Sequence, residues 1–450
     1  MTVYTLFLYI GIVALAIWAI FGVGHSKLKQ HSVTHPVKWY IQYFVGSLLV
    51  FSGLVKAVDP LGTAYKMQDY FTEFQAQGLP FMDTMHENAL VFSLVMLVLE
   101  VVLGLCLILG IGQQRTTRLT FLMILFFTFL TGFNYLTGYT SKPNEVGILE
   151  FAKWEAFSDS NIRITDCGCF GDFLKLKPIE TFCKDILLLI LSFYLMLKTS
   201  NLKELVPQAK KIGPLKLRTL ICLLFIGLSS WFCFQNYYLD KPMVDFRPFA
   251  EGLDLRKAKE DCAANVPVTE TIYTYKNNES SEEKIINSNE IADHPYLWVD
   301  KDVNGKTIWE IQSDKTQSKI IHEGCNSQIQ YFEFPEILEE SDYNFLVLSG
   351  DLTKTDKEAY KKISSLVSTA EKDGIKTRAF YYYTGKQNID AFRHEVNGAY
   401  EFMTADDKLI KTIIRANPGL LLLKDGKVIK KWHHKHVPDY LVVKEQFMSE

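Results

Sequence analysis

The chain has 450 residues and a formal net charge of −3, so its overall charge gives no reason to expect a nucleic-acid partner. Its length allows two or three domains. The mean hydropathy of +0.04 averages two unlike halves. Long apolar runs occupy residues 1 to about 240, while residues 241–450 have an ordinary charged composition. This change in composition is the main predicted domain boundary.

Six stretches of the first half are long and apolar enough to cross a bilayer, which takes about 20 residues. They are residues 3–24, 39–58, 88–111, 118–138, 182–198 and 217–237. The first stretch lacks a basic leading region and a small-residue cleavage site, so we interpret it as a retained span and not as a signal peptide. The fifth is short and is expected to gain a turn from its flanking residues.

Basic residues collect after the first, third and fifth predicted spans. They are Lys27, Lys29, Lys38, Arg115, Arg118, Lys198, Lys203, Lys210, Lys211, Lys216 and Arg218. Positively charged loops stay in the cytoplasm, so these three alternate loops are predicted to be cytoplasmic. The N-terminus, the other loops and all residues from Tyr238 onward are then expected on the outer side.

The loop between the fourth and fifth spans carries two cysteines around one glycine, in the run Asp166-Cys167-Gly168-Cys169-Phe170-Gly171-Asp172. A disulfide across one residue closes a small, strained ring, and strained disulfides are the labile ones. Gly168 supplies the backbone freedom that such a ring needs. We therefore favour a redox pair. Structural pairing with another outer cysteine such as Cys183 stays open, and zinc is a weaker alternative because the loop lacks a second ligand pair.

The remaining cysteines divide by position. Cys183 begins the fifth span, fourteen positions after Cys169, and is a candidate relay thiol. Cys233 ends the sixth span on the same side, where a buried packing role is favoured over a relay. Cys106 and Cys222 are also expected to be packing residues. Cys262 and Cys325 are the two cysteines of the second half, and a structural disulfide between them is the favoured interpretation.

Two ionisable residues belong to predicted spans. Glu100 stands between Leu99 and Val101, deep in an apolar run. An ionisable group there is costly and usually faces a bundle interior or a partner. Its role is either functional, as proton handling or contact with a quinone, or structural, as a hydrogen bond between helices. Lys56, near the end of the second span, is expected to snorkel to the interface.

The second half begins with short β-like runs over residues 265–335 and then shows a clearer α/β pattern. We predict strands at 345–348, 378–383, 420–423 and 428–429. We predict helices from a capping box at Thr355 and Glu358 to about Gly374, at 388–396, at 404–414 and from about Pro438. This order is that of a thioredoxin-like fold, with Pro418 at the position of its cis-proline.

The predicted first core strand is followed by residues 349–354, which contain no cysteine, whereas a catalytic thioredoxin has Cys-x-x-Cys there. Such a domain is expected to bind or position a partner. The histidines His433, His434 and His436 follow Trp432. A solvated strand end is favoured there over a metal site, and no metal site is predicted.

Three features together resemble the DoxX/MauE-like membrane family, in particular bacterial members with an extracytoplasmic thioredoxin-like C-terminal domain. They are the run Gly46-Ser47-Leu48-Leu49-Val50-Phe51-Ser52-Gly53-Leu54-Val55-Lys56, Glu100, and the Asp-Cys-Gly-Cys-Phe-Gly-Asp motif. The resemblance covers about residues 39–199. It implies a four-helix bundle of spans two to five, similar in architecture to the vitamin K epoxide reductase type of disulfide generator. It also implies a bacterial inner-membrane protein with its C-terminal domain in the periplasm.

We therefore expect a multi-domain membrane protein made of an α-helical bundle and an α/β thioredoxin-like domain. The expected parts are an N-terminal span and linker at 1–38, the bundle at 39–199, a linker and sixth span at 200–240, a β-rich insertion at 241–340, and a thioredoxin-like domain lacking Cys-x-x-Cys at 341–450.

MauE-like proteins are associated with disulfide formation in partner proteins, and DoxX-like proteins with quinone-linked sulfur oxidation. The predicted function is a thiol–disulfide oxidoreductase, or an accessory to one, that acts on periplasmic protein thiols. Cys167 and Cys169 would exchange electrons, Cys183 would relay them, and a quinone near Glu100 would accept them. One alternative is a non-catalytic scaffold that holds a periplasmic partner or membrane complex. The other is a subunit of a quinone-linked sulfur-compound oxidoreductase. Membrane lipid is an expected partner in each case.

Overall fold

The protein is described by a computed structural model. It covers residues 3–20, 35–76, 79, 81–136, 168–171, 173–174, 176–199, 214–238, 243–245, 247, 249–264, 268–278, 280, 282–301, 307–311, 317–322, 329, 332, 334–385 and 388–448. The chain forms two compact units. The first contains Met1–Phe157 and Ile162–Phe246, and the second contains Ser158–Asn161 and Arg247–Glu450.

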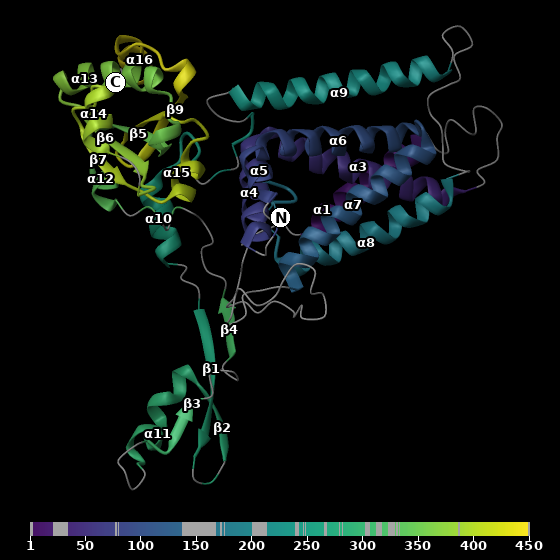
Figure 1. Cartoon of the computed structure of the whole chain (residues 1–450), viewed down its shortest axis with the longest axis horizontal. Helices are drawn as coiled ribbons and strands as arrows, with labels where there is room; N and C mark the ends of the chain where they lie inside the picture. Colours follow the sequence, from purple (N-terminus) through teal and green to yellow (C-terminus); the bar gives the residue numbers. More distant parts are fainter. Residues whose placement is uncertain are drawn as a thin grey trace. The chain divides into compact units, whose positions relative to one another are not determined.

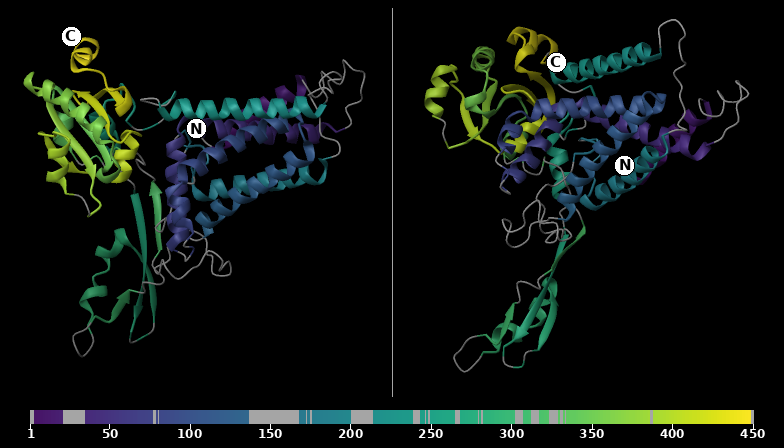
Figure 2. Two further views of the ribbon diagram at one scale, coloured as in Figure 1. Left: turned by 45° about the horizontal axis from the view of Figure 1, so that its top comes forward. Right: turned by 45° about the vertical axis from the view of Figure 1, so that its right-hand side comes forward.

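The first unit is helical, and its long helices run side by side in Figures 1 and 2. The helices are α1 (Val3–Ile17), α3 (Pro36–Val58), α4 (Pro60–Ala76), α5 (Met82–Glu87), α6 (Ala89–Leu109), α7 (Gln113–Leu136), α8 (Pro178–Leu197) and α9 (Pro214–Tyr238). Within the described residues, five helices are long and apolar enough to span a membrane: Val3–Ile20, Pro36–Val58, Ala89–Leu109, Gln113–Leu136 and Leu217–Tyr237.

The predicted fifth span differs from the other five. It does form a helix, α8, which has 20 residues. It is not one of the five candidate spans, because Glu180, Lys184 and Asp185 interrupt its apolar sequence. Burial explains how α8 tolerates two of these charges, since Lys184 and Asp185 are both buried inside the unit.

Glycines bring α3 and α6 into close contact. A Cβ on Gly104 would lie 2.8 Å from the carbonyl oxygen of Gly46, and a Cβ on Gly53 would lie 2.6 Å from Val101. Small residues allow membrane helices to pack backbone against backbone. Gln42 adds a hydrogen bond across the same interface, because its Nε2 donates to the carbonyl oxygen of Leu107 at 2.7 Å.

Four of the described basic residues, Lys38, Arg115, Arg118 and Lys198, lie at one end of this unit. Lys38 at the start of α3 lies near Lys198, which follows α8. The same end of α3 faces the end of α6, after which Arg115 and Arg118 begin α7. The described basic residues are therefore arranged as the alternating-loop interpretation requires. The segments 21–34 and 200–213 lie outside the described residues.

Helix α4 buries its aromatic side chains Tyr70, Phe71 and Phe74. They pack with Leu130 and Phe133 of α7. The apolar face of α4 therefore covers the helical bundle.

The second unit contains two sheets. Helix α10 (Leu255–Ala264) precedes the first, antiparallel sheet, formed by β1 (Val268–Asn277), β2 (Glu283–Asn287), β3 (Trp309–Ile311) and β4 (Gln317–His322). Its order is β2-β1-β3, and β4 also pairs with β1. Helix α11 (Tyr296–Val299) lies between β2 and β3 in the sequence, and α12 (Pro335–Glu339) follows β4.

The second sheet has the order β7-β6-β5-β8-β9. Its elements are β5 (Tyr343–Asp351), α13 (Lys357–Lys372), β6 (Lys376–Tyr382), α14 (Ile389–Glu395), β7 (Glu401–Thr404), α15 (Asp407–Ile413), β8 (Gly419–Lys424), β9 (Lys427–His433) and α16 (Tyr440–Phe447). β5, β6 and β7 are parallel, whereas β8 and β9 are antiparallel to their neighbours.

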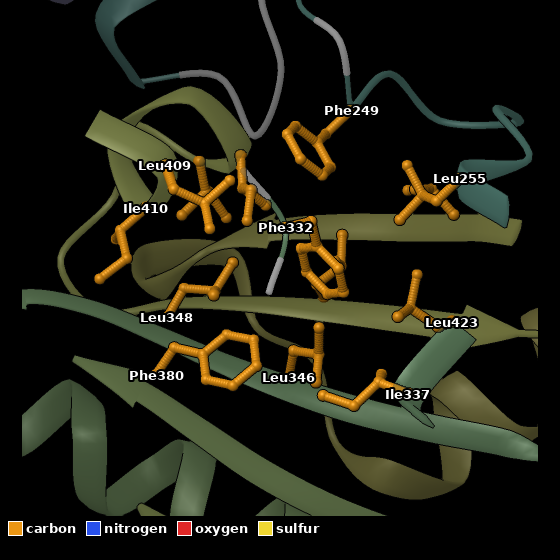
Figure 3. Packing of buried hydrophobic residues seen from close by; sticks show 14 of the residues in the cluster. Phe249, Leu255, Phe332, Ile337, Leu346, Leu348, Phe380, Leu409, Ile410 and Leu423 are labelled. Carbon is orange, nitrogen blue, oxygen red and sulfur yellow. The ribbon is translucent and has the colours of Figure 1, made fainter. Parts of the chain in front are cut away.

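Both faces of this second sheet are buried. Figure 3 shows Leu346 and Leu348 of β5 in the core on one face, together with Phe380, Leu409 and Ile410. The alternate residues of β5 pack on the other face, against α13 and α14. A strand that is buried on both faces has a continuous apolar sequence, as β5 does.

Two details of the sequence prediction are corrected here. The predicted helix at 404–414 begins later, at Asp407, and the short strand β7 precedes it. The N-cap of α13 is Asp356, whose carboxylate accepts from the Ala359 N–H at 3.0 Å. Thr355 therefore does not form the expected capping box. Its hydroxyl donates to the side chain of Asn417 at 2.8 Å instead.

Candidate functional site

The cysteine loop forms a turn, and the aromatic side chain of its Phe170 is buried. Residues 168–171 are described, while Cys167 and Asp172 lie outside the described residues. The Gly171 N–H donates to the Gly168 carbonyl oxygen at 3.1 Å. Both glycines have positive φ, +64° and +52°, a conformation that favours glycine. Phe170 is 1% exposed, with its ring centroid 6.2 Å from that of Phe51.

The loop contacts α3 several residues before the end of this helix. Ser52 Oγ donates to the Cys169 carbonyl oxygen at 3.0 Å. Ser52 precedes the last residue of α3, Val58, by six positions, which corresponds to about 9 Å along a helix. Cys169 therefore lies beside the last turns of α3 and not beyond the end of this helix.

A cavity of about 50 Å³ lies beside Cys169. Residues of α3, α4, α6, α7 and α8 line it together with the loop. Among the lining residues are two lysines and two carboxylates that are almost fully buried: Lys56, Glu100, Lys184 and Asp185. Buried charges within a membrane bundle are expensive and usually functional.

The first pair joins α3 to α6. Lys56 Nζ forms a salt bridge with Glu100 Oε2, and the two side chains are 7% and 3% exposed. Lys56 Nζ also lies 4.9 Å from the ring centroid of Phe127. The expectation that Lys56 snorkels to the interface is therefore wrong. The sequence singled out Glu100 correctly as a buried group but did not identify its partner.

The second pair was missed by the sequence analysis. Lys184 and Asp185 of α8 form a salt bridge with each other. Thr131 of α7 donates to Asp185 Oδ2 at 3.0 Å. Lys184 Nζ lies 5.5 Å from the ring centroid of Phe170, the residue next to Cys169. The sequence signal that could have revealed this pair is the presence of two adjacent, opposite charges inside a predicted span.

A third lysine contacts the loop from α4. A Cβ on Gly168 would lie 2.9 Å from Cγ of Lys66, so the lysine stem packs directly on this glycine. Lys66 also lines the cavity, and its Nζ lies 3.6 Å from Asp69 Oδ2. Each of the three lysines around this cavity forms a salt bridge with a carboxylate.

The other predicted site cysteines lie elsewhere. Cys183 is exposed on α8 and is not among the residues that line the cavity. Cys233 is buried against Ala57 and Leu97. Cys262 is disulfide-bonded, and its predicted partner Cys325 lies outside the described residues.

Cys106 and Cys222 touch each other. Their sulfur atoms are 3.5 Å apart, and they join α6 to α9. Both were expected to pack in the bundle. Each thiol packs against the other, and the sequence does not reveal this contact because the two cysteines are 116 positions apart.

At the end of β5, the side-chain amide of Asn417 accepts hydrogen bonds from two residues. Asn417 Oδ1 accepts from the Gly350 N–H at 3.2 Å and from Thr355 Oγ1 at 2.8 Å. The Asn417–Pro418 peptide bond is cis. No cysteine occurs in the sequence between residues 349 and 354.

The histidines at the end of β9 differ in exposure: His433 is buried, His434 is half-buried and His436 is exposed as expected. His433 is 8% exposed, and burial lowers its pKa to about 4. Burial also lowers the pKa of His434, while Asp356 acts in the opposite direction. Within the described part of the chain, no group of three or more His, Cys, Asp or Glu residues is arranged to hold a metal ion.

The cavity was also compared with the needs of a quinone, which the resemblance implies. Pockets for small organic molecules usually measure about 300–1,000 Å³. The cavity of about 50 Å³ is much smaller, and five charged side chains line it. In this arrangement it does not fit a quinone ring, so no step through a quinone is derived.

Comparison with protein families supports the membrane assignment. The model of one family, described as methylamine utilisation protein MauE, matches residues 34–143. This segment is MauE-like. It contains α3, Lys56, Glu100 and Thr131, and ends before the cysteine loop and α8. The expected resemblance to DoxX/MauE-like membrane proteins is thus confirmed, and the protein is a multi-pass membrane protein. No curated protein and no solved structure matches the chain.

Proposed function

We propose that the protein is a membrane thiol–disulfide oxidoreductase, or an accessory factor for disulfide formation, in which Cys167 and Cys169 exchange electrons with a client protein. One observation carries the proposal. Cys169 is held inside the helical bundle, beside a cavity lined by two buried ion pairs. A purely structural loop has no need of such an environment, because the same turn is compatible with a polar surface.

The chemistry is a two-step exchange. A client thiolate attacks one sulfur of the Cys167–Cys169 disulfide, forming a mixed disulfide and releasing the other sulfur as a thiolate. A second client thiolate then attacks the client sulfur of the mixed disulfide. The client becomes a disulfide, and the loop receives two electrons and two protons. The disulfide of another protein, acting as the oxidant, restores the loop by the reverse reactions.

The proposed location is the bacterial inner membrane, with the cysteine loop and the C-terminal unit on the periplasmic side. The clustering of Lys38, Arg115, Arg118 and Lys198 away from the cysteine loop supports this orientation. Disulfides form and persist in the periplasm. The disulfide at Cys262 agrees with that compartment.

The second sheet of the C-terminal unit is proposed to be thioredoxin-like. Three features support this assignment: parallel β5 and β6 joined by α13, antiparallel β8 and β9, and the cis bond before Pro418 at the start of β8. The missing cysteines after β5 favour a second candidate function. In that case the protein is a scaffold whose C-terminal unit holds a partner.

Serine substitution tests the redox proposal. Cys167→Ser and Cys169→Ser variants should accumulate reduced client proteins, detected by alkylation of periplasmic thiols and mass spectrometry. Cys233→Ser is the matched control, because this thiol is buried against Ala57 and Leu97 and does not line the cavity. Cys183→Ser tests the relay, since its thiol is exposed on α8. Normal client oxidation in both loop variants contradicts the redox function.

The scaffold function makes a different prediction. A stoichiometric complex should survive extraction in mild detergent from cells with the wild-type chain and from cells with the serine variants. Native mass spectrometry of the purified material detects it. Loss of the partner on replacement of Asn417 with alanine, with an intact loop, would assign the partner to the end of β5.

A further inference from the structure

We infer that the Lys56–Glu100 pair is a proton-exchange site for thiol chemistry at Cys169, and that the Lys184–Asp185 pair has the separate role of holding the loop. This inference rests on the proposed redox function and deepens it. It assigns roles to two ion pairs that line one cavity with the reacting cysteine.

The two carboxylates have different surroundings. Asp185 is held by Lys184 and by the Thr131 hydroxyl. Among the described residues, Lys56 is the partner of the Glu100 carboxylate, and no hydrogen bond from a hydroxyl or amide reaches Glu100 Oε2. Glu100 Oε2 can therefore still accept a hydrogen bond from a thiol or a water, whereas Asp185 Oδ2 already accepts one from Thr131.

Lys56 and Glu100 can exist in two protonation states of equal total charge. A proton that moves from Lys56 Nζ to Glu100 Oε2 converts the ion pair to a neutral amine and a neutral acid. Both side chains are at most 7% exposed, so bulk water has little access to this proton. The Lys56 ammonium can give its proton to a leaving sulfur, and the pair can take a proton back from an attacking thiol.

The position of the pair suits transfer to the loop. Ser52, which holds the Cys169 carbonyl, and Lys56 are four residues apart on α3 and so share one face of this helix. The cavity of about 50 Å³ has room for a few water molecules beside the charged groups that line it. A proton can therefore pass between Glu100 or Lys56 and a sulfur of the loop directly or through water.

The Lys184–Asp185 pair contacts the loop at Phe170, the residue next to Cys169. Lys184 faces the ring of Phe170, and Asp185 is bound to α7 through Thr131. These contacts hold Phe170 in place while the neighbouring cysteine reacts. Asp185 and Lys184 are positioning residues in this scheme.

The balanced step with a dithiol reductant is as follows. One dithiothreitol thiolate attacks a loop sulfur, the S–S bond of the loop breaks, and the leaving sulfur takes the electron pair and a proton from the Lys56–Glu100 pair. The second dithiothreitol thiol then gives its proton to the pair and attacks the mixed disulfide. Cyclic oxidised dithiothreitol leaves, and the second loop sulfur takes a proton from solvent. This proton replaces the one that dithiothreitol lost on ionisation. The loop then holds two thiols.

The test measures reduction of the loop itself. The full-length protein in lipid nanodiscs is reduced with dithiothreitol between pH 6 and 9 and quenched with an alkylating agent. Mass spectrometry of the peptide containing Cys167 and Cys169 gives the rate. In the wild type, the rate divided by the thiolate concentration should depend on pH. In Glu100→Gln it should fall by about 10²-fold, typical of a lost general acid, and lose this pH dependence.

Two further variants make the result decisive. Lys56→Met combined with Glu100→Met removes the pair without leaving a buried charge, and should show the same loss. Glu87→Gln, an exposed carboxylate of α5, is the matched control and should react like the wild type. A wild-type rate and pH profile in the folded double variant overturns the inference while the redox function stands. Resistance of the wild-type loop to dithiothreitol overturns both.

Discussion

The contact between α3 and α6 gives the most quantitative prediction. Replacing Gly104 with alanine places a Cβ 2.8 Å from the Gly46 carbonyl oxygen and 2.9 Å from the Val50 backbone nitrogen. Ordinary contacts begin at 3.4 Å, so the two backbones must separate by about 0.6 Å, the difference between these distances. Both close atoms are backbone and cannot rotate away. Overpacking of this kind typically costs about 1–3 kcal/mol.

Gly227→Ala on α9 is the matched control. A Cβ at this position meets nothing within 4 Å. Each substitution gains the same helix propensity, about 1 kcal/mol, so the difference between the two variants isolates the overpacking cost. Thermal unfolding in detergent, followed by intrinsic fluorescence, should give Gly104→Ala a midpoint about 2–12 °C below that of Gly227→Ala.

The Gly46→Ala variant extends the test, because its Cβ would lie 2.9 Å from the Gly104 carbonyl oxygen. Once one alanine has separated the helices, the second should cost less, so the double variant should be more stable than additivity predicts. Equal midpoints for Gly104→Ala and Gly227→Ala would refute the backbone contact on which this reasoning depends.

Three further predictions concern thiols and pH. Mild copper-catalysed oxidation of membranes should join Cys106 to Cys222, and a non-reducing digest should then contain a linked peptide pair. Cys222→Ser should abolish this pair. Absence of the pair from the wild type contradicts the 3.5 Å contact between the two sulfur atoms. Hydrogen bonds from Arg378 and Lys376 lower the pKa of Glu340 to about 2, so the stabilisation they provide is present above pH 4.5 and is lost as pH falls toward 2. The stability difference between wild type and Glu340→Gln should shrink over that range, and a constant difference counts against the ion pair. Burial lowers the pKa of His433 to about 4 in the folded chain. As the pH falls, the unfolded chain therefore binds a proton first, and the free energy of unfolding decreases between pH 6.5 and 4. A His433→Gln variant should lack this decline in chemical denaturation series.

The elements of the fold were largely predictable because they depend on local patterns. Each apolar run of the first half became a helix, and the apolar run around Phe345 became a buried strand. Charge composition explains the exception, since α8 is helical but carries three charges. Strand β7 was missed because its four residues, Glu401–Thr404, alternate weakly and rely on pairing with β6.

The site was predictable only in part, because it is made by contacts between distant residues. The cysteine motif and Glu100 are visible as unusual residues in their local context. The hydrogen bond from Ser52 to Cys169 joins residues 117 positions apart, so no local pattern reveals the depth of the loop. Lys184 and Asp185 fall at the start of the predicted fifth span, and only the packing of α8 against α7 shows that they face inward.

The depth of the Cys169 turn restricts the shape of any protein that reacts with it. Its carbonyl is bound by Ser52 of α3, and its Gly168 packs on the Lys66 side chain of α4. Under the proposed redox function, a client cysteine would have to reach a sulfur packed between these helices. Such a site would favour a slender, unfolded segment over a broad, rigid surface.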